Sequence, residues 1–502
     1  MPAFRLAIAA AVAMPLVLVS PVAAQAQRAT DSLVTIGLTT EAPHLRFSAS
    51  SPATAAMPHF DEPDSLLPCP QCYPKTHFWV AVAELVALQV IPNAFSRITS
   101  DAEWAKVSLN SWGNNLTLPW QWDNNNFKNN QFSHPYHGAM YFNAARTNGY
   151  NFWKSAPWSF VGSLTWELFG EVWAPAPNDL LNTTLGGITL GEMLYRVSSL
   201  TLKNESHGFE RVAREVTAGL LNPVRGFNRV VRGEAWEVSR TPPDWRPSTV
   251  FGSVDAGYRR FSESSNLSGA SALDQVFLSA ELRYGSETFD LGKRPFSFFQ
   301  VQGALASNNG NAGRLTELMV RGGLAAKPLG GDSGQRQLAL FMTYSYINNP
   351  VIAFGAQGFS GGPVWNIQPS HGPSIHVEAL GTAMPIAAIR SDYYLTAEGR
   401  DYDYGIGLGG GGSALLVWKG TGVFGATARY VFVPVISGFP GTHQILTTNV
   451  GGRVYWKGRL GIGAEWVRLW SWNIYYGRTN VNRNASELRL YLSTAVPRWG
   501  AS

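Results

Sequence analysis

The sequence predicts a multi-domain protein of the α+β class, in which an N-terminal helical module precedes an antiparallel transmembrane β-barrel of about twelve strands. The 502 residues are 45% hydrophobic and only 15% charged, a composition that indicates extensive buried or lipid-facing surface and argues against disorder. Most of the 51 glycines lie in the second half of the chain, where the hydrophobic period changes to two. The net charge of +5 is small and the basic residues are scattered, so we expect no nucleic-acid partner.

Residues 1–26 have the layout of a secretory signal peptide. Arg5 precedes an apolar run over residues 6–19, and small residues follow around Ala24 and Ala26. The alternative, an uncleaved membrane anchor, is less favoured because this run is shorter than the ~20 residues that a spanning helix needs. We therefore expect the mature protein to be exported.

A polar and Pro-rich leader, residues 27–75, contains both cysteines of the chain. Cys69 and Cys72 lie in the run Pro-Cys-Pro-Gln-Cys, and an exported location permits a disulfide between them. A redox or metal role is the alternative. It is disfavoured because a redox pair needs a thioredoxin-like context and two thiols alone cannot complete a four-ligand zinc site.

The helical module is expected over residues 76–235. Its first helix covers the apolar residues 77–95, with Pro92 marking its end. The Asn- and Trp-rich residues 114–131 show no period and are predicted to form a loop. A further helix is expected over residues 205–232, near the end of the module.

The densest local signal in the chain is the helix that follows this loop. Ser133 or His134 can cap it, and His134 and His137 flank its first turn, with Asn143 and Arg146 farther along. Two histidines three residues apart can share a metal ion if a third ligand comes from elsewhere. Hydrogen-bonded structural histidines are the alternative, and the metal question stays open.

Two acidic residues share one face of the next predicted helix, residues 157–172. Glu167 and Glu171 are four residues apart, so their like charges repel. If these carboxylates are buried they need a cation, a shared proton or a basic neighbour, and if they are exposed they need only solvent.

Small residues follow at helical spacing on a third helix, which Asn178 and Asp179 are expected to cap. Thr183, Gly187 and Gly191 recur every four residues, a pattern that lets another helix approach closely. The same segment supplies further candidate packing and polar residues, namely Asn182, Gly186, Glu192 and Arg196. Glu192 and Arg196 have the i,i+4 spacing of a favourable ion pair.

We expect the polar residues of this module to gather. His134, Glu167, Glu171, Asp179 and Arg196 each lie on an apolar helix, where a lone charge is costly. Together they supply donors, acceptors and compensating charge, so the sequence predicts one shared polar cluster.

The region over residues 247–502 is predicted to form the barrel. Segments of about ten residues alternate apolar and polar side chains and are separated by turn residues, which is typical of transmembrane barrels. A soluble β-sandwich explains the alternation but not the low charge. Strands are expected to start near Val250, Asp274, Phe296, Thr316, Arg336, Val351, Ser374, Tyr402, Val423, Gln444, Leu460 and Glu487.

Charged residues fall on the lumen side of this alternation and are mixed in sign, so we expect them to pair across the interior. They are Asp255, Arg259, Glu281, Arg283, Glu317, Arg321, Glu378, Arg453 and Arg489. A barrel of this strand number has a limited interior, and the helices fit beneath or beside it more easily than inside. The expected contact partner is outer-membrane lipid, and any envelope protein partner is unknown.

Several blocks of the module resemble a known family. They are His134-Pro-Tyr-His-Gly, Trp166-Glu-Leu-Phe-Gly-Glu171, the run from Asn178 to Glu192, and Asn222-Pro-Val-Arg-Gly-Phe-Asn228. Over roughly residues 120–235 the chain is similar to the bacterial family catalogued as domain of unknown function 3943. The resemblance implies an envelope protein with a β-barrel behind the motif region, and it implies no activity.

Two functions are compatible with these features. The favoured one is a non-enzymatic outer-membrane barrel with a helical plug or docking module, for passage or organisation of envelope components. The alternative is a membrane-embedded hydrolase or transferase acting on lipid or cell-wall material, with His134 or His137 as base or metal ligand and Glu167, Glu171 or Asp179 as the carboxylate. Neither Gly-x-Ser-x-Gly nor Ser-x-x-Lys occurs in a matching context, and no cofactor is expected.

Overall fold

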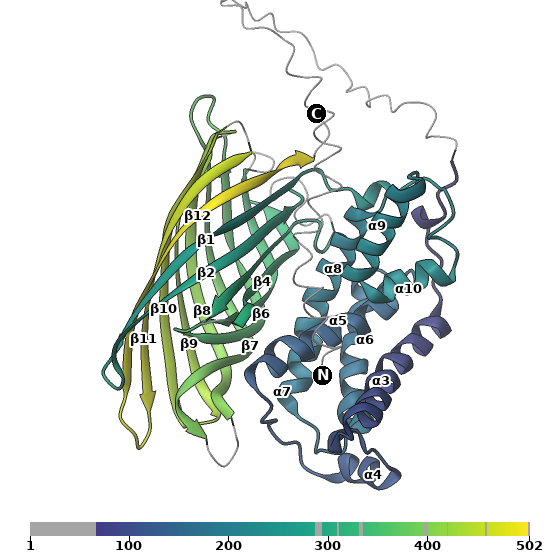
Figure 1. The fold of residues 1–502 in the computed structure, drawn as a ribbon, viewed down its shortest axis with the longest axis horizontal. Coiled ribbons are helices and arrows are strands. Elements are labelled where there is room, and N and C mark those ends of the chain that lie inside the picture. Colours follow the sequence, from purple (N-terminus) through teal and green to yellow (C-terminus); the bar gives the residue numbers. More distant parts are fainter. Residues whose placement is uncertain are drawn as a thin grey trace, which may run out of the picture.

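The protein consists of a bundle of helices that stands beside a closed β-barrel (Figure 1). The computed structural model describes residues 67–286, 294–308, 311–330, 335–395, 400–418, 420–456 and 459–499. The expected signal peptide and most of the leader lie outside the described residues. Cys69 and Cys72 are joined by a disulfide across the short turn Pro70–Cys72.

The module is built from helices of uneven length. They are α3 (Phe78–Ser100), α4 (Leu109–Thr117), α5 (His134–Arg146), α6 (Phe152–Thr165), α7 (Pro177–Leu181), α8 (Gly187–Thr201), α9 (Gly208–Leu221) and α10 (Pro223–Val231). Single π-helical turns precede α5, follow α6 and join α7 to α8, and these are η4 (Asn129–Ser133), η5 (Trp166–Gly170) and η6 (Asn182–Gly186). Such turns are rare and occur frequently at functional sites.

Prolines account for two differences from the predicted helices. α3 continues through Pro92 to Ser100, so the proline lies inside the helix instead of ending it. The single helix expected over residues 205–232 is two helices, because Pro223 starts α10 and the side chain of Asn222 caps it by accepting from the Arg225 N–H.

Two other boundaries were also wrong. Ala176 is the N-cap of α7, so Asn178 and Asp179 lie within the first turn and their side chains bond elsewhere. The region predicted as a loop contains the end of α4 and the beginning of η4. Ser108 caps the start of α4 through a reciprocal bond with Ser111. Short polar helices of this kind lack the apolar period by which helices are recognised in a sequence.

The barrel contains twelve antiparallel strands in sequential order, and β1 pairs with β12 to close it. This confirms the predicted architecture and strand number. The strands are β1 (Val250–Ser265), β2 (Gly269–Tyr284), β3 (Phe299–Asn308), β4 (Asn311–Pro328), β5 (Arg336–Asn348), β6 (Ala353–Ile367), β7 (Ser374–Leu395), β8 (Arg400–Trp418), β9 (Gly422–Ser437), β10 (Gly441–Trp456), β11 (Leu460–Tyr475) and β12 (Val481–Trp499).

Side chains alternate between the lumen and the outer surface. On β12, Leu488 and Leu490 are exposed outside, whereas Glu487 and Arg489 are buried inside. An apolar exterior around a polar interior is the arrangement of a membrane-spanning barrel. The protein is therefore an outer-membrane β-barrel that carries an N-terminal helical module.

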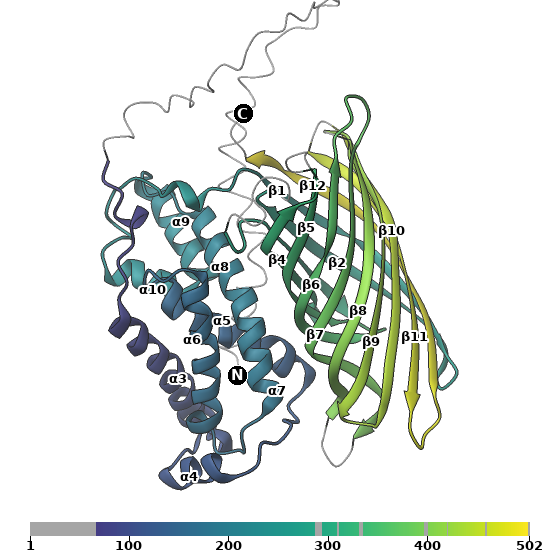
Figure 2. The ribbon, with the colours of Figure 1, turned by 180° about the vertical axis from the view of Figure 1, so that it is seen from behind.

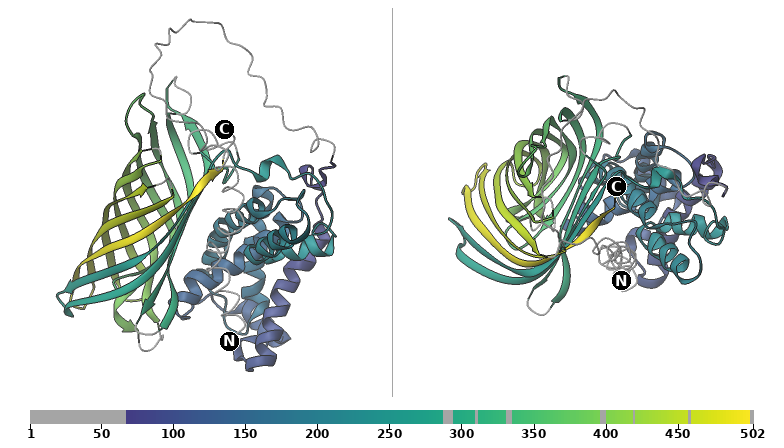
Figure 3. Two further views of the ribbon diagram at one scale, coloured as in Figure 1. Left: turned by 45° about the horizontal axis from the view of Figure 1, so that its top comes forward. Right: turned by 90° about the horizontal axis from the view of Figure 1, so that it is seen from above.

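The module lies against the outside of the barrel wall and not in its lumen, as Figures 1 and 2 show from opposite sides and Figure 3 from above. α8 packs on β4 and β5, η6 on β6 and α7 on β7. The largest buried apolar cluster of the described residues joins the two parts, with Phe142, Ile188 and Met193 of the module against Tyr344 and Tyr404 of the wall. We call this contact the module–barrel seam.

Candidate functional site

The candidate site is formed by residues that lie in or beside the three π-helical turns. η4 leads directly into His134, η5 carries Glu167 and ends before Glu171, and Asp179 precedes η6 by one turn. We call His134, Glu167, Glu171 and Asp179 the acidic cluster. A π turn carries one residue more than an α turn, so each turn changes the direction of the side chains that follow it.

His134 and Asp179 form the centre of this cluster. The His134 Nε2 and Asp179 Oδ1 atoms are 3.8 Å apart, and the other ring nitrogen, Nδ1, is 3.4 Å from the Thr183 hydroxyl. Asp179 accepts a hydrogen bond of 2.8 Å from the Asn178 amide, which also donates to the Tyr404 hydroxyl of β8 at 3.3 Å. The carboxylate is therefore positioned by the module, and its hydrogen-bonding partner is held by the barrel wall.

Glu167 and Glu171 approach the same region from η5. Glu167 accepts a hydrogen bond of 2.8 Å from the Ala176 N–H, and the Asn115 amide holds the Glu171 backbone carbonyl at 2.9 Å. Burial, together with the neighbouring carboxylates Glu167 and Asp123, raises the pKa of Glu171. Burial, Asp123 and Glu171 raise the pKa of Asp179 in the same direction. Each of these carboxyl groups therefore raises the pKa of a neighbouring carboxyl in the cluster.

Buried amides without partners lie close to the acidic cluster. Among the described residues, both side-chain polar atoms of Asn182 and of Gln357 lack a hydrogen-bond partner, as does the Gln131 Oε1 atom. Asn182 starts η6, which packs on β6, and Gln357 belongs to β6. The Gln131 side chain lies against Gly355, on the same strand. Unpartnered buried amides are costly, so these atoms are candidates for binding a polar ligand at the seam.

His137 makes a separate set of contacts. Its ring lies 4.7 Å from the Tyr141 ring and 5.0 Å from the Trp166 ring, and its Nε2 atom is 3.1 Å from the Leu88 carbonyl oxygen. These contacts tie α5 to α3. Within the described parts of the chain, no three His, Cys, Asp or Glu side chains are grouped to hold a metal ion.

Arg196 does not join the acidic cluster, contrary to the expectation. Its guanidinium pairs with Glu192 at 2.9 Å and donates to the Pro295 carbonyl at 2.7 Å. Arg146 pairs with the other oxygen of the same carboxylate at 2.8 Å and stacks on the Tyr195 ring. The physical reason is that Glu192 and Arg196 share one face of α8, whereas Asp179 lies before η6. The extra residue of this π turn rotates the direction in which the later side chains point. The module thus has two polar centres.

Asn143 and the small residues fasten α5 to α8. The Asn143 amide donates to the Gly191 carbonyl at 3.1 Å and accepts from Asn222 at 2.7 Å. A Cβ atom at Gly187 would lie 2.5 Å from the Gly138 carbonyl carbon, and one at Gly186 would lie 2.6 Å from Pro135. The two helices therefore approach to backbone contact, for which only glycine is small enough.

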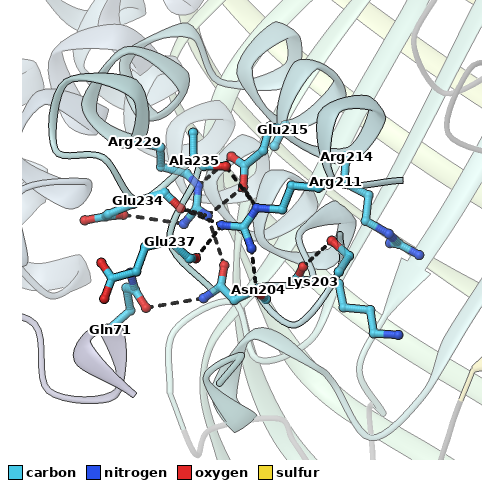
Figure 4. A network of polar contacts seen from close by, with 12 residues as sticks. Gln71, Lys203, Asn204, Arg211, Arg214, Glu215, Arg229, Glu234, Ala235 and Glu237 are labelled. Carbon is cyan, nitrogen blue, oxygen red and sulfur yellow. Dashed lines mark hydrogen bonds and ion pairs between the residues drawn. The ribbon is translucent and has the colours of Figure 1, made fainter. Parts of the chain in front are cut away.

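Sequence reasoning missed an arginine network at the opposite end of the module (Figure 4). Arg229 of α10 holds Glu215 of α9 with two bonds of 2.7 Å and also donates to the Asn204 side chain. Arg211 donates to the carbonyls of Ala235 and Glu237, in the segment that leads to β1. The sequence does show the i,i+4 spacing of Glu210 and Arg214 on α9. That spacing does not reveal the pairing of Arg229 with Glu215, because these two residues lie on different helices. The network fastens the module to the start of the barrel.

Comparisons with known proteins give a family match for part of the helical module and likenesses to solved structures at low identity. A search of curated proteins finds no match. Solved structures that resemble the chain include the NanC porin (8% identity, TM-score 0.25, 47% of this chain and 98% of that one). They also include the outer membrane channel DcaP of Acinetobacter baumannii (9%, 0.23, 49% and 96%) and an anion-selective porin from Comamonas acidovorans (10%, 0.23, 49% and 99%). Residues 119–224, within the helical module, match the profile of the family described as "Domain of unknown function (DUF3943)", so the resemblance noted in the sequence is confirmed over these residues.

Proposed function

We propose that the barrel anchors the helical module in the outer membrane, where the module organises envelope components, and that the lumen is not an open pore. The observation that carries this proposal is the set of ion pairs across the lumen. Arg259 on β1 contacts Glu317 on β4 at 3.4 Å, and Arg489 on β12 contacts the same carboxylate at 2.8 Å. Arg453 on β10 pairs with Glu281 on β2 at 2.9 Å.

These pairs join strands that are not neighbours, so each one crosses the interior. A layer of apolar side chains, including Phe261, Ile445 and Leu469, lies in the same lumen. A cavity of about 340 Å³ between them is lined by residues from many strands. An interior filled with side chains stabilises the barrel, and the outer wall is then the surface through which the barrel holds the helical module.

Ion conductance across planar lipid bilayers tests this proposal. We expect the purified protein to conduct poorly, and we expect the double substitution Arg259→Ala with Arg489→Ala to raise conductance several-fold by unlocking the central pairs. Arg260→Ala is the matched control, because Arg260 is an exposed outward neighbour of Arg259 that pairs with Asp274. A wild-type protein with steady conductance that the double substitution leaves unchanged would contradict the anchor proposal.

The acidic cluster favours a second candidate function, a hydrolase or transferase acting on lipid or cell-wall material. In that function His134, whose Nε2 atom lies 3.8 Å from Asp179 Oδ1, serves as the base, and Glu171, whose pKa burial raises, serves as the acid. Glu171→Gln imitates the protonated acid in shape but cannot transfer a proton. The test compares the cell-envelope phenotype of cells that carry the wild-type protein with that of cells that carry Glu171→Gln. Loss of the wild-type phenotype with a normally folded variant supports catalysis, whereas an unchanged phenotype contradicts it. Glu103→Gln, at an exposed carboxylate, is the control.

A further inference from the structure

The helix α3 has an apolar outer face that none of the described residues covers. Val86, Val90 and Ile91 are exposed, the last by 65%. Glu84 is the only charged residue between Phe78 and Phe95, and it is buried and accepts a hydrogen bond of 2.9 Å from Asn148. Of the helices described, α3 alone is long and apolar enough to cross a membrane. These 18 residues rise about 27 Å, close to the ~30 Å thickness of bilayer hydrocarbon.

The exposed apolar surface continues over other helices of the module. It includes Trp153, Phe160 and Val161 of α6, Val212, Val216 and Leu220 of α9, and Phe227, Val230 and Val231 of α10. Figure 1 shows α3 and α10 on the side of the module that faces away from the barrel. A soluble domain rarely leaves so many large apolar side chains of one helical module exposed to water.

Polar groups gather at both ends of α3. Lys75 and His77 precede the helix, and after its end Lys106 pairs with Asp101 at 3.1 Å and with Glu103 at 2.7 Å. Tryptophans accompany the second group, and they are Trp104, Trp112 and Trp120. An apolar stretch bounded by charges and aromatic side chains is the pattern of a helix that ends at two membrane interfaces.

The barrel wall indicates the depth in the bilayer at which the exposed apolar surface of the module lies. On the outer face of β5, Leu338 and Leu340 are exposed, and the next outward residues, Met342 and Tyr344, are covered by the module. The lipid-facing band of the wall therefore runs directly into the seam. A helical bundle that packs on this lipid-facing band lies at the same depth as the band. Its own outer face therefore meets lipid as well.

We propose that the helical module is embedded in the outer-membrane bilayer beside the barrel, with α3 crossing it and lipid acyl chains covering the outer faces of α6, α9 and α10. This placement goes beyond the anchor function. It makes the module–barrel seam an intramembrane interface.

Site-specific fluorescence on the full-length protein tests this placement. The disulfide occupies both native cysteines, so Val90→Cys provides one thiol for a fluorophore at the middle of α3. Ser100→Cys, at the exposed end of the same helix, is the matched control. The labelled proteins are reconstituted in vesicles of phosphatidylethanolamine and phosphatidylglycerol, with or without brominated acyl chains. Retention of heat-modifiable gel mobility shows that each variant is folded.

We expect brominated lipid to quench the label at position 90 several-fold more than the label at position 100, and aqueous iodide to do the reverse. Equal iodide quenching at the two positions would place α3 in water and overturn the proposal. A label at position 90 that is shielded from iodide and from brominated lipid alike would show that protein covers this face, and would also overturn it.

Discussion

The contact between α5 and α8 offers a sharp test of how the module is held together, through the substitution Gly187→Ala. A Cβ atom at this position would lie 2.5 Å from the Gly138 carbonyl carbon and 2.6 Å from the Gly138 Cα atom. Carbon atoms pack at about 3.5–4.0 Å, so the helices must separate by about 1 Å. The obstructing atoms are backbone, which cannot rotate aside as a side chain can.

Two opposing effects set the size of the change. Overpacking of this kind costs about 1–3 kcal/mol, and the backbone contact places Gly187→Ala toward the upper part of that range. Alanine in place of glycine within a helix returns about 1 kcal/mol through its helix propensity. We therefore expect the module to lose about 1–2 kcal/mol of its unfolding free energy, while the barrel is unaffected.

The control is the same substitution where space is open. Gly113 lies inside α4, and a Cβ atom there meets nothing within 4 Å. Gly113→Ala is expected to stabilise its helix or leave it unchanged. Helix loss on heating is followed by far-UV circular dichroism in micelles, and barrel integrity by heat-modifiable gel mobility. A Gly187→Ala module as stable as the wild type, or as stable as the Gly113→Ala module, would refute the close-approach argument.

Other expectations concern the small residues, the acidic cluster and the seam. Gly191→Leu, with Phe142 only 2.7 Å from its first added carbon, should expose the module to protease while strand content remains. Because burial raises the pKa of Glu171 above its ordinary value of 4.5, its contribution to stability is complete at lower pH and is lost as pH rises, so module stability should fall toward alkaline pH and Glu171→Gln should reduce that slope. Tyr404→Phe removes the acceptor of the Asn178 and Gln131 amides and should weaken the seam by about 1–3 kcal/mol in urea unfolding, whereas Tyr430→Phe, at an exposed hydroxyl, should not.

Local patterns carried most of what could be predicted. The barrel was foreseen because alternation is a property of each strand alone, although β12 starts at Val481 and not near Glu487. The polar centres were foreseen only in part, because a helical wheel assumes one turn length throughout. The π turns η5 and η6 break that assumption, and η6 separates Asp179 from Glu192 and Arg196. No pattern in the sequence announces such a turn.

The seam was beyond prediction for a different reason. Tyr344 and Tyr404 alternate outward on their strands like the aromatic residues that face lipid, and nothing local distinguishes a wall covered by helices from one covered by lipid. The distinction lies in hydrogen bonding. The Tyr344 hydroxyl donates to the Gln131 carbonyl at 2.7 Å, and the Tyr402 hydroxyl donates to the Asn125 carbonyl at the same distance. Such pairs depend on residues that are far apart in the chain.

The composition of the seam changes along its length, and the change bears on function. One part is filled with aromatic side chains such as Phe127 and Phe132 against Tyr346, which suits attachment. The part nearest the acidic cluster holds buried carboxyl groups and unpartnered amides, each of which lowers stability relative to an apolar filling. Selection for attachment alone favours the first kind of surface throughout. The polar part is therefore where a function other than attachment should be sought, and Asn182→Leu, which replaces an unpartnered amide by an apolar side chain, should stabilise the module while impairing that function.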